Sequence, residues 1–532
     1  MPAHADISSL LAHHAATHPD AVAFIDGERT ITYGEFARLC EQSAAWLARN
    51  GVASGDRVAV WLVNRLEWLT LYFGLSRLNA ALIAINTRYR SHELAYILQR
   101  SAATMLVLEP GFRKIDFAAV LGGVDPAAAS ALRRVAVIER GGSPAPEQIL
   151  GLPTTPFSLD DLSDETMPAA GQPDALNLLF TTSGTTSGPK LVMHSQRTIT
   201  VHSQHVADHF GLRERGARLL AALPFCGVFG LNGVLGAFAA GAPVVIMDTF
   251  DAARAVDLIT RHQITHTFGS DEMFQRMLEC APHDAPFPSA RLFGFAAFHP
   301  GAEQLGLEAW RRGVPMFGLY GSSEVQALFS VNDARTPLPD RLKGGGMPCN
   351  PAATVRIRDV ETGDVLPVGQ SGAVEIRADT NFIGYLDNPE ATAKVVGPDG
   401  FFSTGDVGYL RPDGGFVYET RQGDAIRLAG YLVSPVEIED LLKQQPGIRN
   451  AQIVGVELDG RSQCAAFVIL APGGTLDEAA LKASLGATLA PYKVPVRIWA
   501  IAEFPTTQSS NGVKIQRNKL RDLAMKTLEN PA

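Results

Sequence analysis

Short apolar runs alternate with longer helical stretches along this 532-residue chain, and that alternation limits the folds it can adopt. A strand is predicted at 57–62, a helix at 67–79, and further strands at 81–86 and 105–108. Strands separated by helices favour βαβ units in mixed or parallel sheets, with ligands bound near the strand ends. The sequence therefore predicts an α/β fold.

The chain is too long for one compact domain, and its composition changes near residue 420. A glycine-rich, turn-dense block at 369–415 predicts a small β-rich subdomain. After it, Ser434 and Pro435 are typical of a helix start, with Ser434 as the cap and Pro435 in the first turn. We therefore predict a large domain over 1–422 and a small domain over 423–532.

Charge and cysteine usage exclude several classes of protein. The formal net charge is −9 and no Lys/Arg cluster is present, which argues against a nucleic-acid partner. The cysteines lie far apart without a CxxC pair, a pattern typical of reduced, mostly buried thiols in a cytoplasmic protein. They are Cys40, Cys226, Cys280, Cys349 and Cys464.

One stretch, 219–247, contains no charged residue and is long enough to span a membrane. However, Pro224, Asn232 and Pro243 interrupt it, and its end at 242–247 has the pattern of a short buried strand. We expect a helix and a strand buried in the core of a soluble protein, with no membrane span.

A run of hydroxyl and glycine residues at 181–190 follows a predicted strand at 176–180. Glycines let the backbone approach phosphate oxygens, hydroxyls donate hydrogen bonds, and Lys190 adds a cation. Because Pro189 precedes Lys190, the run is not a P-loop, and a solvated turn is the alternative. The predicted phosphate ligands are Thr181, Thr182, Ser183, Gly184, Thr185, Thr186 and Lys190.

This run and four later motifs resemble the adenylate-forming superfamily, which contains acyl-CoA synthetases, adenylation domains of peptide synthetases and beetle luciferases. The later motifs lie at 320–324, 403–406, 421–431 and 512–517, in the order of the family. The resemblance covers essentially the whole chain. It implies a large N-terminal domain of stacked βαβ-type subdomains with a β-rich subdomain, followed by a small, mobile C-terminal α+β domain.

The resemblance also implies roles for single residues. Tyr320 stacks on adenine in a turn with Gly321 and Ser322. Ser323 faces the α-phosphate, although the family usually has Thr there, and Glu324 helps Thr185 to hold Mg²⁺. Taken alone, such a turn is more often an ordinary loop.

The resemblance also implies roles at the ribose and in the small domain. The resemblance implies that Asp406 and Arg421 contact the ribose, although a Gly-Asp pair is commonly just a turn. Gly423 occupies the hinge position, where the family usually has Lys or Asp. Lys514 matches the catalytic lysine, although Val513 is inserted before it, and a surface lysine on a mobile tail is the alternative.

The acceptor and the acid are also predicted from the resemblance. Gly430 and Tyr431 lie where coenzyme A enters. The acyl pocket is assigned to Phe225, Gly227, Phe229 and Phe298. No Asp is present in the segment at 224–230, which disfavours α-amino acids, and an inward Phe298 would shorten the pocket. We expect a small or medium, mostly apolar acid, aromatic or aliphatic.

An unusual segment at 269–272 has two interpretations. Ser270 or Asp271 either caps a helix at 273–278 or recognises a polar group on the acid, and helix capping is favoured.

The sequence thus predicts an ATP-dependent acid–CoA ligase that uses ATP, Mg²⁺ and coenzyme A, as a monomer or homodimer. An alternative is a stand-alone adenylating enzyme that loads an acyl carrier protein. A non-catalytic nucleotide-binding protein is disfavoured because it could discard Lys514. This chain retains the full set of Lys190, Glu324, Asp406, Arg421 and Lys514.

Overall fold

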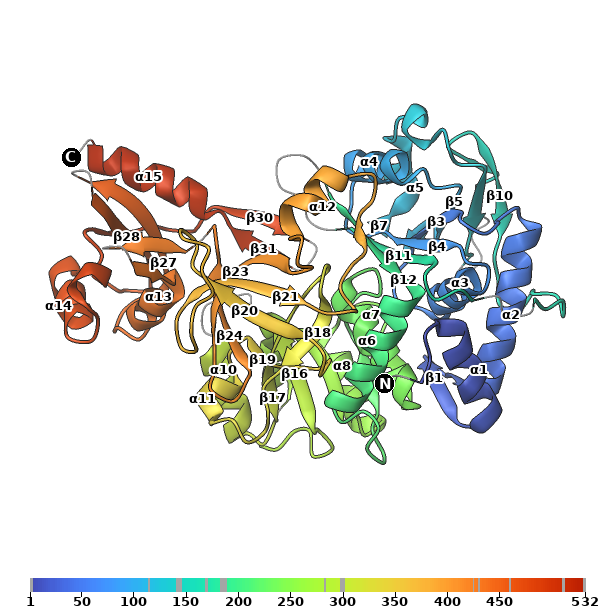
Figure 1. Ribbon diagram of the computed structural model, residues 1–532, viewed down its shortest axis with the longest axis horizontal. Helices are drawn as coiled ribbons and strands as arrows, with labels where there is room; N and C mark the ends of the chain where they lie inside the picture. Colours follow the sequence, from blue (N-terminus) through green and yellow to red (C-terminus); the bar gives the residue numbers. More distant parts are fainter. Residues whose placement is uncertain are drawn as a thin grey trace.

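The computed structural model (Figure 1) contains a large N-terminal α/β domain and a small C-terminal α+β domain, as predicted. It describes residues 3–112, 115–139, 146–167, 171–181, 189–281, 284–296, 302–423, 425–428, 431–458, 461–509 and 512–529.

In the part of the chain that the structure describes, nine strands form one sheet of the large domain in the order β22-β12-β11-β4-β3-β5-β8-β10-β9. Strands β3, β4, β5 and β11 pair in parallel, and the strands predicted in this region and the predicted helix, α3 (Leu66–Arg77), are all present. The bounds are β3 (Arg57–Trp61), β4 (Ala81–Ala84), β5 (Met105–Leu108), β8 (Arg134–Val137), β9 (Gln148–Ile149), β10 (Leu152–Pro156), β11 (Leu176–Thr181), β12 (Leu191–Ser195) and β22 (Gly384–Tyr385).

Thirteen strands of the described residues form the second sheet, in the order β2-β1-β14-β13-β15-β16-β17-β18-β19-β24-β23-β21-β20. Its antiparallel end contains the predicted β-rich block. The bounds are β1 (Val22–Asp26), β2 (Arg29–Thr32), β13 (Leu219–Ala221), β14 (Val244–Ile246), β15 (His266–Ser270), β16 (Leu292–Ala296), β17 (Met316–Ser322), β18 (Gln326–Val331), β19 (Gly345–Pro348), β20 (Thr354–Arg358), β21 (Gly372–Arg377), β23 (Phe402–Leu410) and β24 (Phe416–Arg421).

Helices of the large domain lie around and between these sheets (Figure 1). Their bounds are α1 (Ile7–Thr17), α2 (Tyr33–Arg49), α3 (Leu66–Arg77), α4 (Ser91–Ser101), α5 (Phe117–Gly122), α6 (Gln196–His209), α7 (Val228–Ala240), α8 (Ala252–Arg261), α9 (Asp271–Cys280), α10 (Ala302–Arg311), α11 (Leu338–Arg341) and α12 (Pro389–Val395). Ser270 caps α9 by accepting from the Met273 amide, which confirms the helix-capping interpretation.

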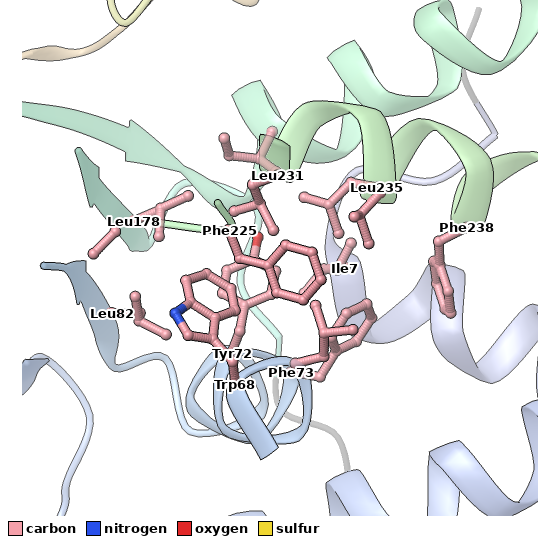
Figure 2. Close-up of a cluster of buried hydrophobic side chains, with 14 of the residues drawn as sticks. Ile7, Trp68, Tyr72, Phe73, Leu82, Leu178, Phe225, Leu231, Leu235 and Phe238 are labelled. Carbon is pink, nitrogen blue, oxygen red and sulfur yellow. The ribbon is translucent and has the colours of Figure 1, made fainter. Parts of the chain in front are cut away.

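The uncharged stretch 219–247 forms β13, α7 and β14, all largely buried, so the prediction of a buried helix and strand is confirmed. Figure 2 shows α7 side chains meeting those of α3, with Leu231, Leu235 and Phe238 opposite Trp68 and Phe73. Among the described helices, none combines the length and the apolar character that crossing a bilayer requires.

The small domain has separate sheets, β25-β26, β27-β28-β29 and β30-β31, and its own apolar core between them and its helices. The bounds are β25 (Ile426–Leu428), β26 (Tyr431–Val433), α13 (Pro435–Lys443), β27 (Ile448–Leu458), β28 (Arg461–Leu470), α14 (Glu478–Gly486), β29 (Ile498–Ala500), β30 (Thr506–Ser509), β31 (Gly512–Ile515) and α15 (Arg517–Glu529).

The helix α13 starts where it was predicted, with Pro435 in its first turn, but one detail of its cap differs. Ser434 is at the N-cap position, but its side chain makes no capping hydrogen bond within the described residues. Its hydroxyl instead donates to the backbone carbonyl of Glu419 at 3.4 Å, which ties the small domain to β24. A neighbouring acceptor thus competes with the helix amides for this hydroxyl. Of the cysteines, Cys280 is exposed and the others are buried free thiols, as expected.

Acid is expected to destabilise this fold because histidines are buried without charge. Four histidine side chains in the described residues are each at most 5% exposed: His14, His194, His202 and His266. Burial lowers the pKa of His202 to about 3 and that of the others to about 4, from 6.5. The unfolded chain therefore binds more protons below pH 6.5. The unfolding free energy is fully retained above that pH and falls as the pH drops toward 4, by up to about 1.4 kcal/mol per pH unit for each histidine.

Urea unfolding from about pH 7 to about pH 5 measures this slope. His14→Leu is the matched variant, because neither ring nitrogen of His14 has a hydrogen-bond partner among the described residues. The ring packs on Tyr33 and Phe238, at 4.8 and 5.4 Å between centroids, where a leucine would remain apolar. The variant should show a shallower slope, and equal slopes in both proteins would contradict the assignment to His14.

Candidate functional site

The predicted phosphate loop begins where β11 ends. Thr181 is the last residue of that strand, and its hydroxyl oxygen accepts a hydrogen bond from Tyr89 at 3.0 Å. At the other end of the loop, the Lys190 ammonium lies 4.5 Å from the centre of the Tyr385 ring. The other predicted phosphate ligands lie outside the described residues: Thr182, Ser183, Gly184, Thr185 and Thr186.

The turn at 320–324 connects β17 to β18 and lies where the two sheets meet. A side chain at Gly321 would place its Cβ 2.6 Å from the Ala327 Cα, so only glycine fits this close approach. The Ser322 hydroxyl accepts from the Glu324 amide at 3.2 Å. The Glu324 carboxylate accepts from the Tyr385 hydroxyl at 2.9 Å. Glu324 is thus oriented by a strand of the other sheet.

Tyr320, Asp406 and Arg421 come together from three strands. The Tyr320 hydroxyl donates to one carboxylate oxygen of Asp406 at 2.5 Å, and the Arg421 guanidinium lies 2.9 Å from the other oxygen. Burial raises the pKa of Asp406 above its ordinary value while Arg421 opposes the shift. Burial also raises the pKa of Tyr320, which keeps its hydroxyl protonated as a donor. The structure therefore places the predicted adenine and ribose residues in one cluster.

We predict that Asp406→Asn weakens ATP binding. The substitution removes the negative charge that faces Arg421 and one acceptor for ribose hydroxyls. Hydrogen bonds to a charged group are worth about 1.5–3 kcal/mol, so Kd for ATP should rise about 10- to 100-fold. Calorimetric titration with ATP measures the change. Asp413→Asn is the control, because Asp413 pairs with Arg411 at 2.9 Å on the surface and has no predicted site role. Equal Kd values for Asp406→Asn and the unsubstituted protein would contradict the ribose assignment.

Two buried polar residues hold this turn and were missed from the sequence. His194, on β12, donates from Nε2 to the Ser323 carbonyl at 2.8 Å. Gln326 has a left-handed φ of 67°, and its amide nitrogen donates to the carbonyls of Thr198 and Thr380 at 2.7 and 3.0 Å. The available signal for His194 was a polar residue that directly follows three apolar residues of β12. Both residues fasten the turn to its surroundings.

The segment before α7 contains three of the predicted acyl-pocket residues. Phe225 is 1% exposed and packs on Trp68 with 5.8 Å between ring centroids (Figure 2). The structure therefore shows Phe225 in the core. Gly227 precedes the first turn of α7, and Phe229 lies in that turn, 6.4 Å from Phe268.

A small apolar cavity lies beside Phe229, between β13, α7 and β15. Its lining includes Leu223, Phe229, Gly230, Gly233 and Phe268. A Cβ at Gly233 would lie 2.8 Å from the Phe268 ring, so this glycine keeps the helix close to the strand. The fourth residue predicted for the acyl pocket, Phe298, lies outside the described residues.

Asn64 fastens the segment before α7, and the sequence motifs did not identify it. Its side-chain oxygen accepts from the Phe225 amide at 2.7 Å, and its nitrogen donates to the carbonyls of Leu223 and Met247 at 2.8 and 2.9 Å. Asn64 is 2% exposed, so these bonds are shielded from water. One buried amide thus connects the end of β3, the start of α7 and the end of β14.

The residues predicted in the small domain are only partly described. Gly423 is exposed after β24, and a Cβ there would meet no described atom within 4 Å. The Lys514 backbone pairs with Thr507 in the β30–β31 hairpin, and the Tyr431 backbone pairs with Leu428. The side chains of Lys514 and Tyr431, and the whole of Gly430, lie outside the described residues.

Glu324 is the described residue that fits the predicted Mg²⁺ site. Mg²⁺ prefers oxygen ligands and is commonly held by one or two carboxylates together with substrate phosphates. The Tyr385 hydroxyl donates to one carboxylate oxygen of Glu324, and the second oxygen would hold Mg²⁺. Among the described residues, no three His, Cys, Asp or Glu side chains gather as metal ligands.

Two family models match the chain. One is described as AMP-binding enzyme and matches residues 11–386, and the other, the AMP-binding enzyme C-terminal domain, matches residues 437–511. The chain is 30% identical to the 2-succinylbenzoate–CoA ligase of Geobacillus kaustophilus, over 97% of this chain and 98% of that protein. It is also 30% identical to the indoleacetate–CoA ligase of Aromatoleum aromaticum, over 97% of this chain and 98% of that one.

The fold is also similar to that of solved structures of CoA ligases. The anthranilate CoA ligase AuaEII in complex with anthranoyl-AMP aligns with a TM-score of 0.82 and 25% identity, over 98% of each chain.

Proposed function

Since the chain belongs to the family of AMP-binding enzymes, we infer that it is an ATP-dependent acid–CoA ligase. One structural observation supports this most directly. Tyr320 and Glu324 lie on a turn of one sheet, and the edge of the other sheet brings Lys190 and Tyr385 to that turn. We propose that the Lys190 cation, the Glu324 carboxylate and Asp406, as the acceptor for the ribose hydroxyls, hold one nucleotide.

In the first half-reaction, a carboxylate oxygen of the acid attacks the α-phosphorus of ATP. A bond forms between that oxygen and phosphorus, the bond to the β-phosphate oxygen breaks, and pyrophosphate leaves. Lys190 and the Thr181 loop would bind the β- and γ-phosphates, and Lys514 would stabilise the charge that develops around the α-phosphate. Mg²⁺, when bound at Glu324, would neutralise phosphate charge.

In the second half-reaction, the sulfur of coenzyme A attacks the acyl carbon of the adenylate. A thioester bond forms, the bond to the phosphate oxygen breaks, AMP leaves, and the thiol proton is released. We propose that the small domain rotates about Gly423 between the two steps, so that Lys514 is withdrawn and Gly430 approaches the acyl group.

We propose a small or medium aromatic acid as the substrate. The side chains around Phe229, which include Leu223 and Phe268, are apolar, and such surroundings suit an aryl group better than a charged one. The named relatives act on 2-succinylbenzoate and indoleacetate, which are both aromatic acids. Phe229 and Phe268 offer ring faces and edges to such an acid.

The test is carboxylate-dependent ATP–pyrophosphate exchange across a panel of benzoates, arylacetates, hexanoate, palmitate and α-amino acids. We expect the aryl acids to be fastest. Palmitate faster than benzoate or hexanoate would contradict the proposed acid. A complete lack of exchange would instead indicate a non-catalytic nucleotide-binding protein. Coenzyme A and a holo-carrier protein are then compared as acceptors, with coenzyme A expected to be preferred.

A further inference from the structure

Tyr385 contacts two predicted nucleotide-site residues of opposite charge. Its hydroxyl donates to a Glu324 carboxylate oxygen at 2.9 Å, and the Lys190 ammonium lies 4.5 Å from the centre of its ring. Tyr385 is 5% exposed, so both contacts are largely shielded from water. Tyr385 lies outside all five predicted motifs.

The backbone explains why Tyr385 reaches both groups. On one side it pairs with Val192 in β12, two residues after Lys190. On the other side the Phe382 amide donates to the Glu324 carbonyl at 2.7 Å, which fastens the same segment to the turn. The Tyr385 amide also donates to the Thr392 hydroxyl at 3.0 Å, within the next helix. The ring is therefore held between the two sheets by main-chain bonds on each side.

We propose that Tyr385 is a positioning residue that orients Glu324 for Mg²⁺ and Lys190 for the nucleotide phosphates. This inference rests on the proposed function. The phenol is a fixed donor to one carboxylate oxygen, so the other oxygen is turned to the metal. The face of the ring attracts the ammonium and restricts its position before the phosphates arrive.

The protonation state agrees with this role. Burial, and next the Glu324 carboxylate, raise the pKa of Tyr385 well above its ordinary value. The hydroxyl therefore stays protonated and donates at neutral pH.

Two substitutions separate the two contacts. Tyr385→Phe removes the hydroxyl and keeps the ring, whereas Tyr385→Leu removes both. Calorimetric titration with ATP, in EDTA and at increasing Mg²⁺, measures binding independently of turnover. Mg²⁺ is expected to increase the affinity for ATP, and for Tyr385→Phe we expect that half of this increase requires about a tenfold higher Mg²⁺ concentration. In EDTA, we expect the Kd for ATP to change by less than about twofold. For Tyr385→Leu we also expect about fivefold weaker ATP binding in EDTA.

Tyr72→Phe is the matched control. Tyr72 is fully buried, and its hydroxyl donates to Asn177 at 2.6 Å in the core of the same domain. This variant should lose thermal stability with unchanged Mg²⁺ dependence. If Tyr385→Phe likewise loses thermal stability while its Mg²⁺ dependence is unchanged, Tyr385 is merely structural and the proposal is overturned. If the unsubstituted protein does not bind ATP at any Mg²⁺ concentration, the proposed function itself fails.

Discussion

Lys514→Ala is expected to slow adenylate formation about 10²- to 10³-fold while leaving thioester formation from a supplied acyl-adenylate largely intact. Removing one group that stabilises developing charge in a transition state typically costs this much. Lys514 lies on β31 of the small domain and follows the inserted Val513, which pairs with Gln508. ATP–pyrophosphate exchange measures the first step. Thioester formation from a synthetic adenylate measures the second.

Lys519→Ala is the matched control, since Lys519 is an exposed lysine on α15 in the same domain. It removes the same charge, and both half-reactions should keep their rates. Equal loss of both steps in Lys514→Ala would contradict the assignment of the catalytic lysine. Because Lys514 is expected to contact the substrate only in the first step, the ratio of the two effects is the informative quantity.

Glu439→Ala is expected to destabilise the small domain by about 3–5 kcal/mol, because it leaves a partly buried guanidinium without its charge partner. Glu439 is fully buried on α13 and lies 2.8 Å from the Arg517 guanidinium. It also accepts from the Ile453 amide at 2.8 Å, and Arg517 Nε donates to Gln452 at 3.1 Å. Urea unfolding monitored in the small domain measures the loss.

Two comparisons make this prediction specific. Glu457→Ala removes an exposed carboxylate from β27 and should change the unfolding free energy by less than about 0.5 kcal/mol. The double variant Glu439→Leu with Arg517→Met removes both charges and should regain most of the lost stability. A double variant as unstable as Glu439→Ala would show that the ion pair is not the cause.

The Glu439 network also reaches the predicted catalytic lysine through the backbone. Arg517 lies three residues after Lys514, and the Gln516 amide donates to the Pro505 carbonyl at 2.8 Å, next to the β30–β31 hairpin. Glu439→Gln is therefore expected to slow adenylate formation more than thioester formation. If Glu439→Gln slowed both half-reactions by the same factor, this link would be contradicted.

Local patterns predicted much of the fold correctly. Apolar runs at 57–62 and 105–108 form β3 and β5, and the uncharged stretch 219–247 forms a buried strand, helix and strand. Such elements depend on the periodicity of apolar side chains and on proline and glycine residues that end them. Both features can be read from a single sequence. The predicted domain boundary at residue 422 remains a prediction, as do the roles of Gly423, Lys514 and Gly430.

Contacts between distant segments were not predictable. Ser434 was expected to cap α13, but the Glu419 carbonyl takes its hydroxyl, and no local pattern reports a competing acceptor from another strand. The contact of Phe225 with Trp68 also joins segments far apart in the chain, and the acyl-pocket role of Phe225 remains a prediction. His194, Asn64 and Tyr385 were missed for the same reason, because each acts on a residue far along the chain.

The sequence alone determined the α/β class and the family, and it indicated which charged residues we propose for the nucleotide site, because these follow from residue types, order and spacing. The tertiary structure decided which groups meet. Tyr385 lies beside Glu324 and Lys190 only because β22 pairs with β12 and the Phe382 amide bonds the turn of the other sheet. Pairing between strands that are distant in the sequence depends on packing across the whole core. No local pattern therefore predicts which of these strands pair.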